Sequence, residues 1–315
     1  MKVCTFWVGM FGFAILDLIW DNPDFEFFAY EQNKDTTKII QESRRHPFFF
    51  GNISLHPQVQ ILTEYEKILP EMDILLLILP YQFLRAFIIQ IQPLLKPGVL
   101  IVNLSKGINN STLTTVSEDL SVILQDFPYS YAVLSGGMIA SELVDGAPLG
   151  ANIALSDSKD QSILQNLLHR KNLHIDFIDG SIRQIELMSA LKNILALLVG
   201  YHEWKGLSAS SIGYVLVRAY REIEHLLFHL GWSADLRFWM YATGGDIIAT
   251  CFGNSRNRYL GRLVWEGMSP RSALEKLKNE KKTAEGYHTL LGLGALLANS
   301  PEYPLLLSLF HIFSD

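Results

Sequence analysis

The stretch Lys2-Val3-Cys4-Thr5-Phe6-Trp7-Val8-Gly9-Met10-Phe11-Gly12 decides the fold class of this chain of 315 residues. Val3–Val8 is an apolar run of strand length, and Phe13–Trp20, which follows the two glycines, is typical of a buried helix. A buried strand that turns directly into a helix begins a β-α-β unit. The stretch therefore predicts a parallel sheet built by right-handed helical crossovers.

Further short apolar runs alternate with helix-like segments through the first half of the chain. The predicted strands are Phe25–Tyr30, Asp73–Leu79, Gly98–Leu104, Tyr131–Leu134 and Ala151–Leu155. Asp73–Leu79 is almost entirely apolar, which indicates a central strand covered on both faces. This half of the chain is predicted to have an α/β fold with a doubly wound, Rossmann-type sheet.

From about Gln184 the pattern changes to apolar residues spaced three and four apart, which is typical of helices. Gly180 and Ser181 mark the change. The sequence therefore predicts an N-terminal domain over residues 1–180 and an all-helical C-terminal domain over residues 181–315. The helices expected in the second domain are Gln184–Glu203, Ser210–Leu230, Ser233–Thr243, Pro270–Asn279 and Tyr303–Phe313.

Composition excludes several classes of protein. Lys and Arg total 26 against 32 Asp and Glu, with no basic block, so no nucleic acid is expected as a partner. No stretch reaches the roughly 20 apolar residues of a membrane span. Cys4 and Cys251 are the two cysteines and cannot form a disulfide framework, which fits a cytoplasmic protein. His225 and His229 share a helical face, but no third ligand is evident, so no metal site is predicted.

The turn after the first predicted strand has the spacing of the dinucleotide-binding motif G-x-G-x-x-G, with Trp7 in place of its first glycine. Gly9 would let the backbone approach a pyrophosphate, and Gly12 would let helix and strand pack closely. The amino terminus of the helix that follows would offer free N–H groups and a partial positive charge to the anion. A side chain as large as that of Trp7 requires a positive φ or a different turn, so an ordinary strand with incidental glycines remains an alternative.

Glu31 ends the second predicted strand about twenty residues beyond these glycines. A carboxylate there can accept hydrogen bonds from ribose hydroxyls, and it would repel an additional 2′-phosphate. We therefore expect residues 1–180 to bind NAD rather than NADP. A solvated loop charge is the alternative reading of Glu31.

Six further segments, in order along the chain, together resemble the NAD-dependent glycerol-3-phosphate dehydrogenase family. They are Leu79–Arg85 (similar to VP-x-Q-x-x-R), Ser105–Gly107 (S/T-K-G), Leu134–Glu142 (LSGP-x-x-A-x-E), Ala190–Asn193 (ALKN), Gly244–Cys251 (G-x-GD-x-x-x-TC) and Ser255–Arg258 (SRNR). The resemblance implies interconversion of sn-glycerol 3-phosphate and dihydroxyacetone phosphate with NAD(H). It also implies a small phosphorylated substrate and a homodimer.

The resemblance also assigns roles to particular residues. The catalytic residues implied are Lys192, Asp246 and Lys106. The substrate-binding residues implied are Lys106, Asn193, Thr250, Arg256 and Asn257. The cofactor-binding residues implied are Gly9, Met10, Phe11, Gly12, Glu31, Pro80, Phe83, Ala140, Arg256 and Glu285.

Lys192 also stands out without the resemblance. It is the only charged residue between Glu186 and Glu203, on a predicted helix whose neighbouring residues are apolar. Burial disfavours the charged ammonium form, so we expect its pKa to fall from the usual value of about 10.4 toward neutral pH, where the amine can exchange a proton. The alternative is that the side chain extends past the core to solvent.

The chain departs from the family pattern at Trp7, at Gly137, which replaces a proline, and at Thr243, which replaces a glycine. The stretch 202–210 also differs from the family's D-G-L-G-x-G-D-N. These departures leave two alternatives open: a related dehydrogenase of another small hydroxy acid or phosphorylated alcohol, and a catalytically inactive dinucleotide-binding sensor.

Overall fold

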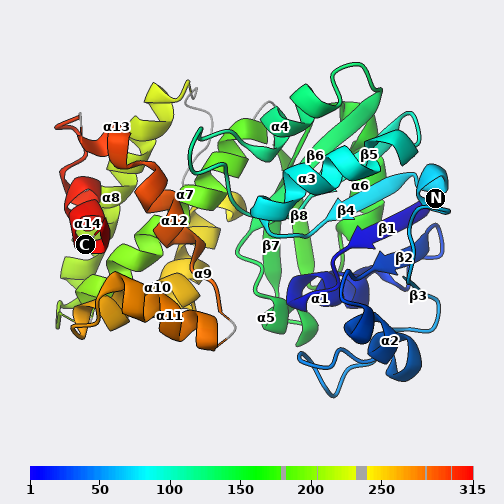
Figure 1. Cartoon of the computed structure of the whole chain (residues 1–315), viewed down its shortest axis with the longest axis horizontal. Helices are drawn as coiled ribbons and strands as arrows, with labels where there is room; N and C mark the ends of the chain where they lie inside the picture. The colour runs from blue at the N-terminus through cyan, green and yellow to red at the C-terminus, as the bar shows by residue number, and fades with distance from the viewer. Residues whose placement is uncertain (179–181, 204, 232–239, 281, 299, 315) are drawn as a thin grey trace. The chain divides into compact units, whose positions relative to one another are not determined.

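The computed structural model describes the chain except residues 179–181, 204, 232–239, 281, 299 and 315 (Figure 1). It consists of two compact units. Unit 1 comprises Met1–Lys106 and Val116–Ile182, and unit 2 comprises Gly107–Thr115 and Arg183–Asp315. The segment 107–115, predicted as part of the N-terminal domain over residues 1–180, thus belongs to unit 2. The expected boundary at residue 180, and most of the helix expected over 233–243, lie outside the described residues.

Unit 1 is built on an eight-stranded sheet, and the prediction of a doubly wound α/β fold is confirmed. The strand order is β3-β2-β1-β4-β5-β6-β7-β8, and neighbouring strands are parallel except for the antiparallel pair β6 and β7. The strands are β1 (Lys2–Phe6), β2 (Glu26–Tyr30), β3 (Gln60–Leu62), β4 (Ile74–Leu77), β5 (Val99–Asn103), β6 (Tyr129–Gly136), β7 (Leu149–Leu155) and β8 (Leu173–Ile178).

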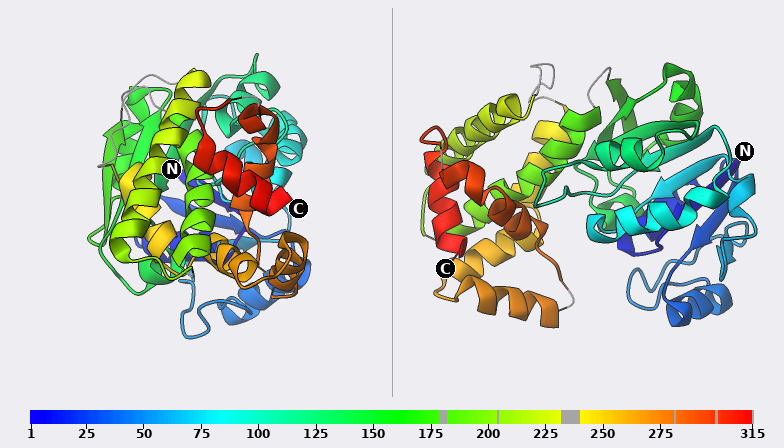
Figure 2. Two further views of the ribbon diagram at one scale, coloured as in Figure 1. Left: turned by 90° about the vertical axis from the view of Figure 1, so that its left-hand side faces the viewer. Right: turned by 45° about the horizontal axis from the view of Figure 1, so that its top comes forward.

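Helices cover both faces of this sheet, as Figures 1 and 2 show. Helices α1, α5 and α6 pack together on one face, and α3 and α4 pack together on the other. All four residues of β4 are buried, as expected for a central strand. The helices of unit 1 are α1 (Met10–Ile19), α2 (Lys34–Ser43), α3 (Tyr81–Ile91), α4 (Val116–Ile123), α5 (Ala140–Val144) and α6 (Gln161–Leu168), with short 3₁₀ turns at Leu69–Glu71, Gln92–Leu94 and Ser158–Asp160.

The order of the strands creates a switch point between β1 and β4. From β1 the chain continues to β2 on one side, whereas β4 and the strands after it lie on the other side. The loops that leave the carboxyl ends of β1 and β4 therefore diverge, and in open α/β sheets ligands bind in the crevice between such loops. The residues after these two strands are accordingly the first place to look for a cofactor site.

The described residues of unit 2 form helices and connecting loops without a β-strand, as predicted. Every residue of α7 from Ile185 to Gly200 is buried, which makes α7 the core of the unit. The helices are α7 (Ile182–Glu203), α8 (Ala209–His229), the π-helical turn η4 (Tyr241–Gly245), α9 (Asp246–Phe252), α10 (Arg256–Trp265), α11 (Pro270–Asn279), α12 (Glu285–Gly292), α13 (Gly294–Ala298) and α14 (Pro304–Ser314). Among the described residues, no helix is long and apolar enough to cross a membrane.

Two glycines let α7 and α10 cross with their backbones in contact. A Cβ atom on Gly200 would lie 2.0 Å from the backbone oxygen of Arg258, and one on Gly261 would lie 2.2 Å from that of Leu197. Both distances are far below van der Waals contact, so neither position accommodates a side chain in the present packing. The crossing brings the first two turns of α10 against the last two turns of α7.

A buried carboxylate on α8 holds the first turn of α14. Glu222 is 6% exposed, and its oxygens accept hydrogen bonds from the backbone N–H groups of Leu305, at 3.0 and 3.1 Å, and of Leu306, at 2.9 Å. A carboxylate at a helix N-terminus satisfies unpaired N–H groups and interacts favourably with the helix dipole.

We expect Glu222→Ala to lower the free energy of unfolding by about 2 kcal/mol or more, because it leaves buried N–H groups unpaired. Urea denaturation would measure the change, with Glu275→Ala on the exposed face of α11 as the control. An unfolding free energy within about 0.5 kcal/mol of the parent would contradict this role of Glu222.

Candidate functional site

The turn after β1 forms without its first glycine because Trp7 adopts the left-handed conformation, with φ of 71°. Its backbone N–H donates to the oxygen of Tyr30 at 2.9 Å, and its indole packs edge-on against Phe87. A Cβ on Gly12 would lie 2.2 Å from the Trp7 oxygen, so the close approach of turn and helix requires glycine there. The strained residue is thus held from both sides, and the predicted role of Gly12 in packing is confirmed.

The N-terminus of α1 has the features of an anion site. Gly9 is its N-cap, no side chain caps the helix, and no acidic residue lies in its first turn, which begins with Met10 and Phe11. A Cβ on Gly9 would meet no atom within 4 Å, so the backbone faces open space at this point. These residues fit the pyrophosphate of a dinucleotide, which binds to the free N–H groups of such a helix end.

Glu31 follows β2 and is tied to the same turn. Its carboxylate accepts hydrogen bonds from the backbone N–H groups of Val8 at 3.1 Å and Asn33 at 3.0 Å. Asn33 in turn caps α2 by accepting from the N–H of Thr36. A carboxylate has lone pairs for about four hydrogen bonds, so Glu31 can hold this loop and still accept from a ribose hydroxyl.

The other predicted cofactor residues of unit 1 follow the next strands of the sheet. Pro80 is the N-cap of α3, the helix that follows β4 in the chain, and Ala140 begins α5, the helix that follows β6. Phe83 is 50% exposed, so it does not belong to the core. Lys106 follows β5 and is the last residue of unit 1 before the segment 107–115. All of these residues follow the carboxyl ends of strands in one sheet.

The start of α3 is anchored by a buried carboxylate from α4. Asp119 accepts hydrogen bonds from the Tyr81 hydroxyl and from Nη1 of Arg85, both at 2.6 Å. This contact gives the arginine of the VP-x-Q-x-x-R segment a structural role. It fixes the turn of α3 that presents Phe83.

In unit 2, a buried ion pair joins α7 to α9. Nζ of Lys192 lies 2.5 Å from Oδ1 of Asp246 and donates to the hydroxyl of Thr250 at 2.7 Å. Lys192 and Asp246 are each 2% exposed, so the alternative of a lysine that reaches solvent does not hold. The carboxylate stabilises the ammonium form and opposes the effect of burial. Nζ is therefore held by a carboxylate and a hydroxyl that both belong to α9.

A second polar group lies beside the first, because Asn193 is the next residue of α7. Its Oδ1 accepts from Nδ2 of Asn257 at 3.1 Å, and Oδ1 of Asn257 accepts from the backbone N–H of Gly286 at 3.0 Å. A Cβ on Gly286 would lie 2.5 Å from the backbone oxygen of Asn193. The loop that carries Glu285 is therefore packed directly on α7.

The two arginines of the SRNR segment have different surroundings. Arg256 is exposed at the first position of α10, and its Nη1 donates to the hydroxyl of Thr283 at 3.3 Å. Arg258 instead forms a bidentate ion pair with Glu203, with N–O distances of 2.6 to 2.8 Å. Arg256 is thus the guanidinium that can take up an anion.

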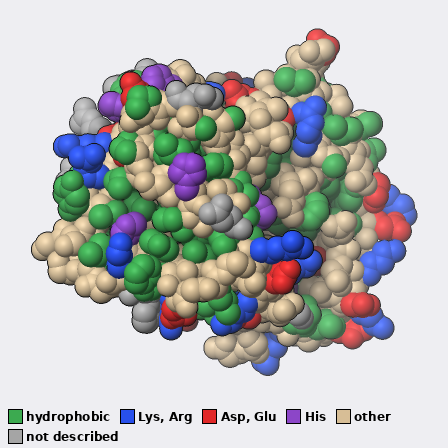
Figure 3. Space-filling view, turned by 60° about the vertical axis from the view of Figure 1, so that its left-hand side comes forward, with side chains coloured by type: hydrophobic (Ala, Val, Ile, Leu, Met, Phe, Trp, Pro, Cys, Tyr) green, Lys and Arg blue, Asp and Glu red, His purple; other side chains and the backbone are tan. Residues whose placement is uncertain are grey.

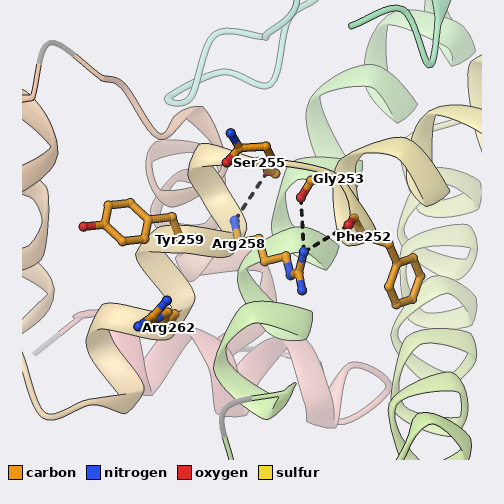
Figure 4. A pocket seen from close by; sticks show the side chains of 7 residues that line it. Phe252, Gly253, Ser255, Arg258, Tyr259 and Arg262 are labelled. Atoms are coloured by element: carbon orange, nitrogen blue, oxygen red, sulfur yellow. Dashed lines mark hydrogen bonds between the residues drawn. The ribbon is translucent and has the colours of Figure 1, made fainter. Parts of the chain in front are cut away.

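Arg258 also closes the turn between α9 and α10. Nη1 of Arg258 donates to the backbone oxygens of Phe252 and Gly253, and the backbone N–H of Arg258 donates to the Ser255 hydroxyl (Figure 4). A cavity of about 400 Å³ adjoins this turn and is also lined by Tyr259 and Arg262. Arg258 therefore holds the backbone that precedes Arg256 and Asn257.

Several supporting residues were not predicted from the sequence. Glu203, Thr283 and Gly286 pair with site residues that are 27 or more positions away, and no local spacing indicates such pairs. Cys251 lies beside the ion pair, and burial raises the pKa of its thiol to about 12, which keeps the thiol protonated and unreactive. His229, considered above for metal binding, instead contacts the Tyr303 hydroxyl and lies 3.7 Å from Glu302.

Comparison with known proteins shows to which family the chain belongs. Residues 2–161 match the profile of the NAD-dependent glycerol-3-phosphate dehydrogenase N-terminus, and residues 182–315 match that of its C-terminus. The chain belongs to the NAD-dependent glycerol-3-phosphate dehydrogenase family. It is therefore related to oxidoreductases that use NAD(P), and the sequence resemblance noted above is confirmed.

Individual members of the family are similar to this chain at moderate identity. Glycerol-3-phosphate dehydrogenase [NAD(P)+] of Geobacter sulfurreducens is 28% identical over 85% of this chain and 80% of its own length. The enzyme of the same description from Thermobifida fusca is 28% identical over 96% of this chain and 90% of its own length. The crystal structure of glycerol-3-phosphate dehydrogenase from Coxiella burnetii superposes with a TM-score of 0.86 at 20% identity, over 98% of this chain and 94% of that one, which confirms the fold.

Proposed function

We propose that this protein interconverts sn-glycerol 3-phosphate and dihydroxyacetone phosphate with NAD(H). The observation that carries the proposal is the buried ammonium group of Lys192, held by Asp246 and Thr250 on the helix that also presents Asn193. Membership of the dehydrogenase family supports the reaction type. It does not favour the inactive sensor or a dehydrogenase for another substrate.

Lys192 is the proton donor and acceptor in this proposal. NAD(H) supplies the group that accepts or donates hydride at C2 of the substrate. In the reduction, the Lys192 ammonium group gives a proton to the ketone oxygen, and in the oxidation the amine takes the proton of the C2 hydroxyl. Asp246 fixes the position of Nζ and stabilises its charge. The Thr250 hydroxyl accepts a second hydrogen bond from the ammonium group.

The substrate phosphate is proposed to bind Arg256 and the amide of Asn257. A guanidinium offers forked donors that suit a phosphate, and the neighbouring amide adds a donor. Asn193 orients Asn257 through the hydrogen bond between their side chains. Lys106 is proposed as a further cation for the substrate because it belongs to the Ser105–Gly107 family motif.

The cofactor is proposed to bind the carboxyl edge of the sheet in unit 1. Gly9–Gly12 would hold the pyrophosphate, and Glu31 the ribose. The other proposed contacts are Pro80, Phe83, Ala140, Arg256 and Glu285, which begins α12.

A direct assay tests the proposal. Purified protein should oxidise NADH when dihydroxyacetone phosphate is added, as loss of absorbance of the reduced cofactor, and should reduce NAD with sn-glycerol 3-phosphate. Binding of NADH without turnover of this substrate pair, but with turnover of another hydroxy acid, would favour a related dehydrogenase. Binding of NADH without turnover of any such substrate would favour the sensor.

We predict that the protein prefers NADH to NADPH and that Glu31→Gln weakens this preference by roughly fivefold. The charge of Glu31 would repel a 2′-phosphate, and two charges about 4 Å apart interact by about 1 kcal/mol in water. The Gln side chain keeps an acceptor oxygen for one of the N–H groups of Val8 and Asn33, which bind different oxygens of Glu31. The ratio of kcat/KM for the two cofactors measures the effect, with Glu42→Gln on the exposed side of α2 as the control. An unchanged ratio would remove Glu31 from cofactor selection.

A homodimer is proposed from the resemblance, with α8 as its contact surface. Figure 3 shows hydrophobic side chains at several places on the face of unit 2 that it presents. On α8, Tyr214 and Val217 are 65% and 54% exposed, and they share one helical face with Phe228. Exposed apolar patches of this kind often mark interfaces.

Light scattering should give twice the mass of one chain for the parent. It should give the mass of one chain for Tyr214→Glu combined with Val217→Glu. The control Ile89→Glu, at an equally exposed apolar residue of unit 1, should leave the parent mass unchanged. A dimeric double variant would exclude this surface.

A cytoplasmic location is also proposed. Both cysteines, Cys4 and Cys251, are buried free thiols, as expected of a protein that folds in a reducing compartment.

A further inference from the structure

Ser189 carries a buried hydroxyl group that lacks a partner. The residue is 3% exposed in α7, and its Oγ has no hydrogen-bond partner among the residues that the structure describes. A serine inside a helix commonly satisfies its hydroxyl by donating to a backbone oxygen one turn earlier, but Ser189 does not. Buried hydroxyls without a partner are rare in folded proteins, and each one calls for an explanation.

The position of Ser189 on α7 connects it with the proposed site. Residues three and four apart on a helix share a face, so Ser189 lies one turn before both Lys192 and Asn193. Around the helix axis, the Ser189 side chain projects between those of Lys192 and Asn193. Nδ2 of Asn193 approaches the backbone oxygen of Ser189 to 3.4 Å, so the Asn193 side chain extends back over the turn of Ser189. The hydroxyl therefore lies on the face of α7 that carries the proton donor and the amide that orients Asn257.

Other buried side-chain oxygens without a partner among the described residues lie elsewhere. Thr5, Ser135 and Asp160 belong to unit 1, and Asn110 belongs to the segment 107–115. None of them is on α7 beside Lys192. Ser189 is the one of these groups whose position relates it to the substrate.

The proposed substrate has three polar groups, and the proposed function accounts for two of them. The C2 oxygen faces Lys192, and the phosphate faces Arg256 and Asn257. The C1 hydroxyl still needs a partner in a buried site, because an unpaired polar group there opposes binding. A serine hydroxyl can donate to it or accept from it.

We propose that Ser189 is a specificity-determining residue whose hydroxyl hydrogen-bonds the C1 hydroxyl of the substrate. The inference rests on the proposed function. It adds that the site distinguishes dihydroxyacetone phosphate from the analogue hydroxyacetone phosphate, in which a methyl group replaces the C1 hydroxymethyl group. Without that hydroxyl, the Oγ of Ser189 stays unpaired in the complex, and sites that are built to bind a hydroxyl reject analogues lacking it.

The test is the ratio of kcat/KM for dihydroxyacetone phosphate to kcat/KM for hydroxyacetone phosphate, each measured with saturating NADH. The parent should favour dihydroxyacetone phosphate by at least about tenfold. Ser189→Ala should lower kcat/KM for dihydroxyacetone phosphate by about tenfold and change that for the analogue by less than about threefold, because only the first pair loses a hydrogen bond. The control Ser308→Ala, at an exposed serine of α14, should leave both values unchanged.

The outcomes separate this inference from the proposed function. A parent that oxidises NADH with dihydroxyacetone phosphate, together with a Ser189→Ala ratio equal to that of the parent, would overturn the role of Ser189 and leave the proposed function intact. An equal loss with both substrates, or a higher KM for NADH alone, would likewise overturn it, since the hydroxyl would then serve the fold or the cofactor. A parent that turns over neither compound would overturn the proposed function and this inference with it.

Discussion

Replacing Lys192 by alanine is expected to lower kcat by about 10²- to 10⁴-fold, the usual contribution of a positioned general acid or base. The substitution removes the only side chain that the proposal assigns to proton transfer at the C2 oxygen. NADH binding should change little, because the proposed cofactor residues lie mainly in unit 1. Steady-state NADH oxidation measures kcat, and quenching of protein fluorescence measures binding.

The same substitution also acts on stability, so a second variant is needed. Removing one member of a buried ion pair leaves the other charge uncompensated, which costs about 3–5 kcal/mol in other proteins. Lys192→Ala should therefore unfold at lower urea concentration, since Asp246 is 2% exposed. The double variant Lys192→Met, Asp246→Leu replaces the pair by apolar groups and should recover much of that stability while remaining inactive.

The pattern of activity and stability identifies the role of Lys192. Lys278→Ala, at an exposed lysine of α11, is the control and should match the parent in both measurements. A stable double variant with kcat within about threefold of the parent would show that the ion pair serves the fold alone.

The second large effect concerns the crossing of α7 and α10. Gly200→Ala should lower the free energy of unfolding by about 2 kcal/mol or more. Alanine favours a helix over glycine by about 1 kcal/mol, but its Cβ would lie 2.0 Å from the backbone oxygen of Arg258, and only movement of a whole helix relieves that contact. Moving Arg258 also moves Asn257 away from Asn193, so KM for the phosphorylated substrate should rise.

Substitution of a second helical glycine, Gly213, should change the free energy of unfolding in the opposite direction. Gly213 lies inside α8, and a Cβ there would meet no atom within 4 Å. Gly213→Ala should therefore raise the free energy of unfolding by up to about 1 kcal/mol through helix propensity. Urea denaturation of both variants measures the contrast. Stabilisation by Gly200→Ala would contradict the tight crossing.

Elements with a strong local pattern could be predicted from the sequence. β1 and its turn follow from an apolar run and two glycines, and α7 follows from apolar spacing over twenty residues. The helix predicted from Phe13 in fact begins at Met10, because the capping geometry at Gly9 decides the start of α1 and periodicity does not show it.

Strands that form by pairing with segments distant in the sequence were not predicted. β3 has only three residues and no periodicity of its own, and it forms because β2 offers an edge to pair with. β8 alternates buried and exposed residues, but its polar members conceal the pattern in the sequence. The antiparallel pairing of β7 with β6 depends on how the chain returns to the sheet, which no local signal encodes.

The candidate site also combines residues that local motifs predict with contacts that depend on distant pairing. The family motifs identified Lys192 together with its partner Asp246, and they identified Asn257, but they did not indicate the supporting contacts of Glu203, Thr283 and Gly286. Arg258 pairs with Glu203 at a separation of 55 positions. Such pairs arise from the packing of α7 against α9 and α10. Trp7 illustrates the reverse case, since its sequence position predicted strain and the structure shows a positive φ held by neighbouring contacts.

The most direct test of the central claim is a single-turnover measurement. Parent and Lys192→Ala protein, each saturated with NADH, are mixed rapidly with excess dihydroxyacetone phosphate, and the loss of reduced cofactor is followed in the first turnover. We predict that this step slows by at least about 100-fold in the variant while both ligands bind. A first-turnover rate within about threefold of the parent would show that Lys192 does not move the proton.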